Sequence, residues 1–134
     1  MKLEITINND KDKAIIEKVL NEKMPDPCYT IGYTNPDGYF LTAFTNYTRN
    51  TDIEGTCIAS GKWFDIGIYK HLFTWVFGTL KCKRFTFRIQ RDNHKCIELA
   101  KKAGCVQECE LRGTDMLLYS ILPEECKYYV RRKT

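Results

Sequence analysis

Apolar residues recur with two different spacings along the chain, and each spacing predicts one kind of secondary structure. Alternation of apolar and polar residues, or a short apolar run between turn residues, predicts a strand. Apolar residues three or four positions apart predict one face of a helix. The stretches with the strand pattern are 2–7, 29–34, 39–47, 53–59, 84–89, 105–110 and 114–122. The stretches with the helix pattern are 10–23, 66–77 and 93–103.

The boundaries between these stretches carry residues that suit turns and helix ends. Pro25 and Pro27 are expected to end the first helix, because proline cannot continue the hydrogen-bond ladder. Asn35-Pro36-Asp37-Gly38 predicts the turn of a hairpin, and Gly78 and Gly104 predict the ends of the other two helices. The resulting order β-α-β-β-β-α-β-α-β-β predicts an α+β fold, with a mixed sheet covered by helices.

The first strand and the first helix are both expected to turn an apolar stripe towards the core. In the strand the stripe is Leu3, Ile5 and Ile7, as in a half-buried strand. Asn9 or Asp10 is the expected cap of the helix. The stripe of the helix consists of Ile15, Ile16, Val19 and Leu20.

Length and composition indicate one globular domain. The chain has 134 residues, of which 43% are apolar and 13% aromatic, enough to bury a core without disulfides or metals. We expect a single domain over residues 1–134, with a basic tail from about residue 123. No apolar run approaches the about 18 residues of a membrane span, and the first residues do not resemble a signal peptide. A cytoplasmic location without membrane contact is therefore expected.

Cysteine usage and charge limit the chemistry further. The seven cysteines include no C-x-x-C pair, so we expect neither a disulfide framework nor a metal site, and mostly buried thiols. The net charge is +4, but residues 81–102 alone carry eight basic residues against two acidic ones. Such a patch attracts the phosphates of a nucleotide cofactor or of a nucleic acid, and it is also what a solvated basic face looks like.

The stretch from Cys82 to Tyr119 joins a strand, an Asp92-Asn93 turn, a helix and Gly104 in an order that resembles a known family. It is similar to the second half of the GNAT superfamily of N-acetyltransferases, specifically the short ribosomal-protein-acetyltransferase-like branch. The residues that carry this resemblance are Arg84, Phe85, Phe87, Ile89, Asn93, Cys96, Leu99, Lys101, Lys102, Gly104 and Cys105. A weaker likeness to phage-type sequences rests on Trp63, Asp65 and 75–77. The resemblance implies a mostly antiparallel central sheet flanked by helices.

The resemblance also implies acetyl-CoA as a co-substrate. In this family the cofactor binds to the backbone of three consecutive parts: the fourth strand, the loop after it and the start of the next helix. The helix N-terminus binds phosphate because it offers unpaired N–H donors. The loop from Lys62 to Gly67 departs from the family pattern, which is richer in arginine and glycine. The residues assigned to this site are Cys57, Ile58, Ala59, Ser60, Gly61, Lys62, Trp63, Phe64, Asp65, Ile66, Gly67, Asn93, Lys95 and Cys96.

Acetyl transfer needs a base for the amine and an acid for the leaving thiolate. By family analogy Glu54, on the fourth strand, is the candidate base. Many members carry a tyrosine as the acid where this chain has Ala100, so Cys96 and Tyr119 are the candidates for catalysis in its place, together with Ser60. The two histidines, at positions 71 and 94, are expected to be exposed.

The resulting hypothesis is an acetyl-CoA-dependent N-acetyltransferase that acts on a primary amine, such as one on a protein, and a homodimer is a further expectation. Its acceptor side is expected at residues 22–29 and 111–115. One alternative is a GNAT-fold protein that binds CoA or a partner without turnover, for example a phage-encoded modulator in the host cytoplasm. A nucleic-acid binder is disfavoured, because Phe85 and Phe87 share the face expected to be buried.

Overall fold

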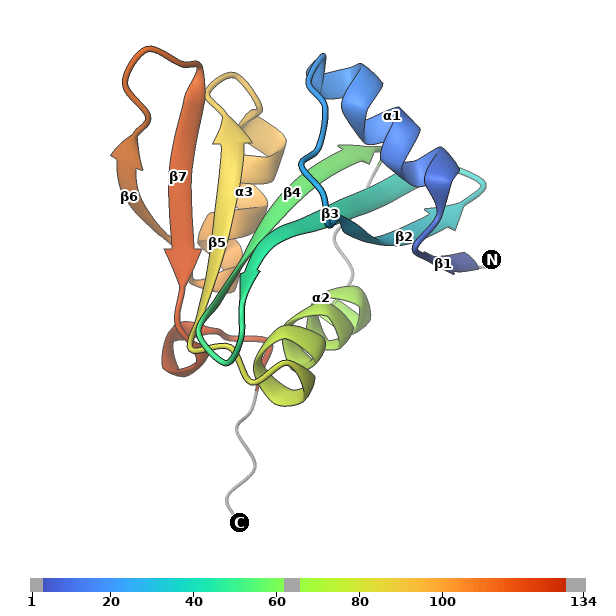
Figure 1. The fold of residues 1–134 in the computed structure, drawn as a ribbon. Helices are drawn as coiled ribbons and strands as arrows, with labels where there is room; N and C mark the ends of the chain where they lie inside the picture. Colours follow the sequence, from blue (N-terminus) through green and yellow to red (C-terminus); the bar gives the residue numbers. More distant parts are fainter. Residues whose placement is uncertain (1–3, 62–65, 130–134) are drawn as a thin grey trace.

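The structure, a computed structural model, describes residues 4–61 and 66–129 (Figure 1). It has the predicted order of elements, which confirms the α+β fold. The strands are β1 (Glu4–Ile7), β2 (Tyr29–Asn35), β3 (Gly38–Thr48), β4 (Asp52–Ser60), β5 (Arg84–Gln90), β6 (Val106–Glu110) and β7 (Met116–Ile121). The helices are α1 (Asp10–Leu20), α2 (Ile66–Thr74), a π-helical turn (Trp75–Thr79), α3 (His94–Ala103) and a short 3-10 helix (Pro123–Glu125).

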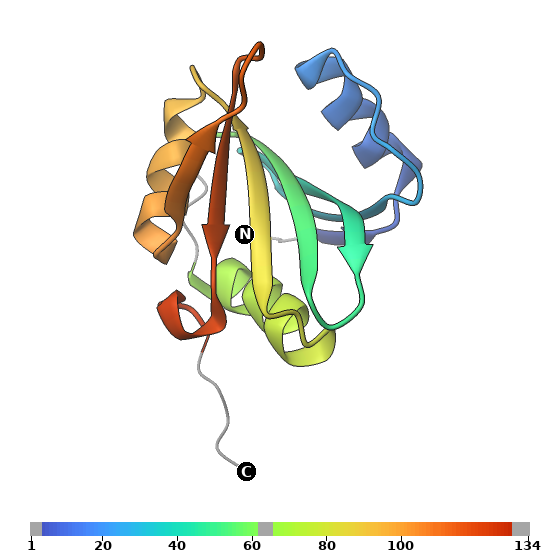
Figure 2. The ribbon, with the colours of Figure 1, turned by 60° about the vertical axis from the view of Figure 1, so that its left-hand side comes forward.

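The seven strands form one sheet in the order β1-β2-β3-β4-β5-β7-β6. Every neighbouring pair is antiparallel except β4 and β5, which run parallel because α2 connects them as a crossover. Helix α1 covers one face of the sheet, whereas α2 and α3 cover the other (Figures 1 and 2). The sheet therefore separates the molecule into two sides, and the candidate site uses both.

Each side of the sheet has its own core. Under α1 the core is small and contains Ile16, Met24, Leu41, Ala43 and Ile58. Under α2 and α3 it is larger and rich in aromatic residues. Examples of these aromatic residues are Phe44, Phe73, Phe77, Phe85 and Phe87. Adjacent residues of a strand point to opposite faces, so Ile58 belongs to the small core although its neighbours Cys57 and Ala59 pack against the large one.

Helix α1 is shorter and less amphipathic than the sequence predicts. It ends at Leu20 instead of continuing to Lys23, because Asn21 takes a left-handed conformation with φ of 52° and donates back to the last carbonyls. Asn9 caps the start, as expected, by accepting from the N–H groups of two helical residues. Within the predicted stripe only Ile16 is fully buried, while Val19 is 53% exposed. The small core under α1 also receives Leu20 in part, but it leaves Ile15 and Val19 in solvent.

The expectation of a half-buried first strand is wrong for its apolar residues. Ile5 is 49% exposed and Ile7 is 58% exposed. β1 is the outer strand of the sheet, and it turns Thr6 towards α1, where the hydroxyl donates to the buried carboxylate of Asp12. The residue next to the core is thus the polar one. Residues 2 and 3 of the predicted strand lie outside the described residues.

The second predicted helix changes geometry before it ends. After Thr74 the chain continues as the π-helical turn to Thr79, one residue beyond the predicted stop at Gly78, and the N–H of Leu80 donates to the carbonyl of Trp75. The segment after the 3-10 helix packs back on α2, since the ring of Tyr128 stacks on that of Tyr69 at 5.4 Å. The C-terminal segment therefore helps to fix α2 on the sheet.

Candidate active site

The sheet splits between β4 and β5. Their pairing begins at Asp52 with Arg84 and ends at Gly55 with Phe87. Beyond that pair, residues 56–60 and 88–90 do not pair with each other, and the two strands diverge (Figure 1). Backbone N–H and C=O groups that would be bonded in a continuous sheet therefore face the split, where they are available to a ligand.

Gly55, the last position of β4 that pairs with β5, is a glycine for a steric reason. A Cβ atom on Gly55 would lie 2.7 Å from the ring of Phe85 and 3.3 Å from that of Phe87. These two rings lie together on β5, with centroids 4.1 Å apart. Only glycine lets both rings pack against β4 at the start of the split. Burial of both phenylalanines also means that they are not available for stacking on nucleic-acid bases.

On the side of α2 and α3, an apolar pocket of about 490 Å³, which includes space open to solvent, lies against the split. Its lining residues come from the sheet and from both helices. They are Phe40, Cys57, Tyr69, Leu72, Phe73, Phe87, Ile89, Cys96, Leu99, Ala100, Ala103 and Cys105. We call this the α2–α3 pocket.

The thiols of this pocket are uncharged. Burial raises the pKa of Cys57 to about 12, and burial also raises the pKa of Cys96 and of Cys105. The Cys96 thiol donates to the carbonyl of Cys57 at 3.8 Å, which joins α3 to β4 across the split. A nucleophilic cysteine needs a lowered pKa, so these thiols form an apolar wall and not a nucleophile at neutral pH.

The start of α3 carries a helix cap. The side-chain oxygen of Asn93 accepts from the N–H of Cys96 at 3.3 Å, as in an N-cap. Lys95 and His94, which follow it, are exposed. His71 is exposed as well, but its ring nitrogen lies 2.6 Å from the hydroxyl of Tyr33.

Part of the predicted cofactor loop lies outside the described residues, namely Lys62, Trp63, Phe64 and Asp65. Ser60 ends β4, and Ile66 opens α2. Gly61 has a φ of 91°, and a Cβ atom there would lie 2.7 Å from the backbone oxygen of Asp37. Glycine is therefore required where β4 turns towards the loop.

On the opposite face, beside α1, a second pocket opens onto the split. We call it the acceptor-side pocket, because residues 22–29 were expected to form the acceptor side. Its lining residues are Glu22, Met24, Pro25, Thr45, Glu54, Thr56, Arg88 and Met116. Thr56 and Arg88 directly follow the last pair of β4 and β5. Of the other expected acceptor segment, 111–115, none lines this pocket, but the next residue, Met116, does.

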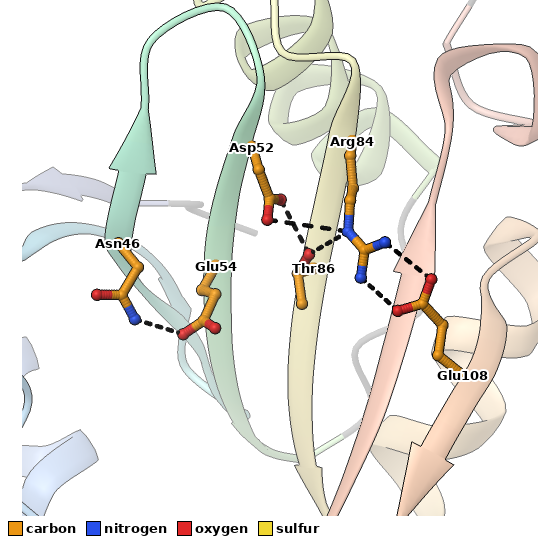
Figure 3. Close-up of polar contacts among 6 residues, drawn as sticks. All are labelled: Asn46, Asp52, Glu54, Arg84, Thr86 and Glu108. Atoms are coloured by element: carbon orange, nitrogen blue, oxygen red, sulfur yellow. Dashed lines mark hydrogen bonds and ion pairs between the residues drawn. The ribbon is translucent and has the colours of Figure 1, made fainter.

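Glu54 is half-buried in the acceptor-side pocket and is held by a neighbour (Figure 3). The amide nitrogen of Asn46 donates to its carboxylate at 2.7 Å. Asn46 reaches Glu54 because the register of β3 shifts between Thr45 and Thr48, and φ of Asn46 is 51°. In a regular strand, Asn46 would point to the face opposite that of Thr45. The bulge thus positions the candidate base.

At the other end of β5, polar residues form a closed network on the same face (Figure 3). The guanidinium of Arg84 binds Glu108 with two hydrogen bonds, one of 2.8 Å, and its Nε donates to Thr86 at 2.9 Å. The Thr86 hydroxyl in turn donates to Asp52 at 2.9 Å. The hydrogen bond from Arg84 lowers the pKa of Glu108, whereas burial raises the pKa of Asp52.

The three predicted catalytic residues occupy different places. Glu54 lies in the acceptor-side pocket, and Cys96 lines the α2–α3 pocket. Tyr119 lines neither pocket; it is buried on β7, and its hydroxyl donates to Gln107 at 3.1 Å. No pattern along the chain selects Asn46 or Arg88, which lie on the same side: Asn46 binds Glu54, and Arg88 lines the acceptor-side pocket.

Comparison with known proteins identifies the fold. No protein-family profile and no curated protein sequence matches the chain. Among solved structures, the N-acetyltransferase PseH of Campylobacter jejuni, in complex with acetyl coenzyme A, has a TM-score of 0.61 at 14% identity. That match covers 90% of this chain and 99% of PseH. The chain therefore has the GNAT fold.

A second similar protein acts on a polyamine. The dodecameric spermidine N-acetyltransferase of Vibrio cholerae has a TM-score of 0.64 at 16% identity, over 90% of this chain and 93% of its own. A variant of the same enzyme, SpeG, reaches 0.65 at 18% identity, over 94% and 95% of the two chains. At these identities the likeness concerns the GNAT fold, and the closer resemblance to the ribosomal-protein-type and phage-type branch stays a prediction.

Two further observations concern membranes and metals. Within the part of the chain that the structure describes, no helix has the length and apolar character that crossing a bilayer requires. Among the same residues, no three His, Cys, Asp or Glu side chains are grouped as metal ligands would be.

Proposed function

We propose that this chain is an acetyl-CoA-dependent N-acetyltransferase that moves an acetyl group to a primary amine. The observation that carries the proposal is the split between β4 and β5, with a pocket on each face of the sheet. A thioester that enters from one side can then meet an amine that enters from the other. The acetyl-CoA complex of the structurally similar PseH supports the choice of co-substrate.

The α2–α3 pocket suits the pantetheine arm of acetyl-CoA. The arm is a narrow chain of methylenes and two amides, and the pocket offers apolar walls next to backbone groups that face the split. Cys57 and Ala100 belong to these walls, and Asn93 lies beside them at the start of α3. The α2 N-terminus and the basic residues 95, 101 and 102 are the proposed partners of the phosphates.

Glu54 is the proposed general base. It lies in the acceptor-side pocket, and the hydrogen bond from Asn46 fixes its carboxylate. Proton removal from the ammonium frees the lone pair that attacks the acetyl carbonyl. The backbone N–H groups in the split are suited to stabilise the oxyanion that follows. As the acid for the leaving thiolate we favour Cys96 over Tyr119, since Cys96 lines the α2–α3 pocket and Tyr119 lines neither pocket.

Two measurements test the proposal. Acetyl-CoA at about 100 times its dissociation constant should stabilise the protein by about 2.7 kcal/mol, seen as a rise in Tm that dephospho-CoA reproduces only in part. Release of CoA thiol in the presence of an amine should fall about 100- to 10,000-fold in Glu54→Gln. Glu98→Gln, an exposed change on α3, is the matched control and should leave the rate unchanged.

A binding protein without turnover is the second candidate. It is favoured by Ala100, which stands where many GNAT enzymes carry a catalytic tyrosine, and by the altered loop from Lys62 to Gly67. A rise in Tm with acetyl-CoA, but no thiol release with any amine, would support this candidate. A narrower form of the first proposal is transfer to an amine on a protein. A narrower form of the second is a phage-encoded protein that modulates a host protein.

A further inference from the structure

Three arginines, Arg84, Arg88 and Arg91, lie along β5 and just after its end, and they differ in whether their side chains bind a carboxylate. Arg84 binds Glu108, and Arg91 lies 3.2 Å from the carboxylate of Glu110. The side chain of Arg88, between them, makes no hydrogen bond or ion pair with any residue in 4–61 or 66–129. It is nevertheless half-buried. Among the described residues no buried side-chain nitrogen lacks a partner, so the Arg88 guanidinium is reached by solvent and is open to a ligand while its stem is packed.

Arg88 occupies the position where a ligand would use it. It is the first residue of β5 beyond the last pair with β4, and its side chain lines the acceptor-side pocket. Glu54 lines the same pocket and binds Asn46, not Arg88. A positive group and a candidate base are thus presented together at the split, without neutralising each other through an ion pair.

We propose that the acceptor is a small amine of amino-acid type, whose carboxylate binds Arg88 while its amino group faces Glu54. This inference rests on the proposed acetyltransferase function. A guanidinium can form two parallel hydrogen bonds with a carboxylate, which fixes orientation as well as position. The reacting nitrogen is then directed towards the split.

The charges of the pocket select this class of acceptor. Glu22 and Glu54 provide two negative groups, and Arg88 provides one positive group. A phosphate dianion would meet both carboxylates with only one guanidinium to bind it. A polyamine such as spermidine would place a second cation near Arg88. A zwitterion complements the pocket at both of its charged groups, with its ammonium towards Glu54 and its carboxylate towards Arg88. Only three apolar residues, Met24, Pro25 and Met116, line the pocket, which favours a small molecule.

The test compares amines that differ only by a carboxylate. 4-Aminobutyrate with propylamine, and β-alanine with ethylamine, are such pairs with a single amino group, and spermidine is added as a polyamine. CoA thiol release should give a kcat/KM for the carboxylated member that is about 10- to 100-fold higher, the range expected for hydrogen bonds between charged groups. Arg88→Gln should reduce this ratio to about 1, mainly through KM. Arg91→Gln, the matched control outside the pocket, should retain it.

The outcomes separate this inference from the function on which it rests. Equal use of both members of each pair, preference for spermidine, or an unchanged ratio in Arg88→Gln would overturn the carboxylate assignment while acetyl transfer stands. Absence of acetyl-CoA binding, measured by the rise in Tm, would overturn the proposed function together with the inference. If Arg88→Gln unfolds, Arg88→Lys tests the same point, since it keeps the charge without the two parallel donors and should lower the ratio partly.

Discussion

The two ends of β5 use the same residue type in opposite ways. At its start, β4 and β5 are paired, and Arg84 is bound to Glu108 and lies 3.8 Å from the carboxylate of Asp52. At its end the two strands diverge, and Arg88 faces a pocket without a bound carboxylate. The comparison teaches that the closed end holds the two halves of the sheet together, so that the open end can leave polar groups to a ligand.

The largest effect is expected where the closed end meets the core. Phe85 is fully buried and packs against Gly55, Phe44 and Phe73. Phe85→Ala removes this packing and should lower the free energy of unfolding by about 3–5 kcal/mol, measured by urea denaturation. A loss below about 1 kcal/mol would contradict a role of this end as the junction of the sheet.

A change in the α2–α3 pocket, which lies against the open end, should alter the binding of acetyl-CoA more than the stability of the protein. Ala100 is only partly buried and lines the α2–α3 pocket. Ala100→Phe fills this space, so acetyl-CoA should bind at least about 10-fold more weakly by calorimetry, while Tm of the free protein changes little. Ala100→Ser adds one atom and serves as the control, with affinity expected near that of the wild type. Unchanged affinity in Ala100→Phe would place the cofactor elsewhere.

A smaller effect is expected from the polar network of the closed end. Arg84 and Glu108 have side chains that are both 34% exposed, so Glu108→Gln should cost only about 1 kcal/mol. Glu110→Gln removes the partner of Arg91 in a more exposed pair, and it should cost still less. Chemical denaturation of the two variants measures the loss in the free energy of unfolding for each ion pair. An equal loss would mean that the network around Arg84 adds no stability beyond that of an exposed pair.

The smallest effect is a dependence of this network on pH. The hydrogen bond from Arg84 lowers the pKa of Glu108 in the folded protein below 4.5, the value for the free side chain. Its contribution is therefore fully present above pH 4.5 and is lost as the pH falls through the lowered pKa. Asp52 acts in the opposite sense, because burial raises its pKa and so favours the protonated form.

The difference in Tm between the wild type and Glu108→Gln should accordingly shrink as the pH falls below 4.5. Thermal unfolding between about pH 3 and pH 6 measures it. A difference that stays constant over this range would show that Glu108 acts through its shape and not through its charge.

Much of the architecture followed from local patterns in the sequence. Period-two alternation located Phe85, Phe87 and Ile89 on the buried face of β5, as observed. Alternation failed for Ile5 and Ile7, and helical spacing failed for Val19, since all three are exposed. Periodicity shows which residues share a face, but burial depends on whether another element covers that face.

The candidate site was predicted only in part, because its geometry also depends on contacts between segments far apart in the chain. Family resemblance named Glu54 as the candidate base, and the structure has Glu54 in one pocket with Glu22, Met24 and Pro25, while its catalytic role stays a prediction. Asn46 was missed, because strict alternation would place it on the face opposite that of Glu54. A bulge in β3 turns its side chain to the face of Glu54 instead. Arg88 was missed because nothing along the chain distinguishes it from Arg84 and Arg91, whose partners lie 24 and 19 residues away.

The sequence by itself determined the type and order of the helices and strands, because backbone hydrogen bonding and side-chain periodicity are local properties. It also determined which strand faces are apolar. Only the tertiary structure decided where β4 and β5 part, which arginine of β5 is left without a carboxylate, and which side of the sheet receives each pocket. These features depend on the register between strands far apart in the chain, and register is set by packing across the whole sheet.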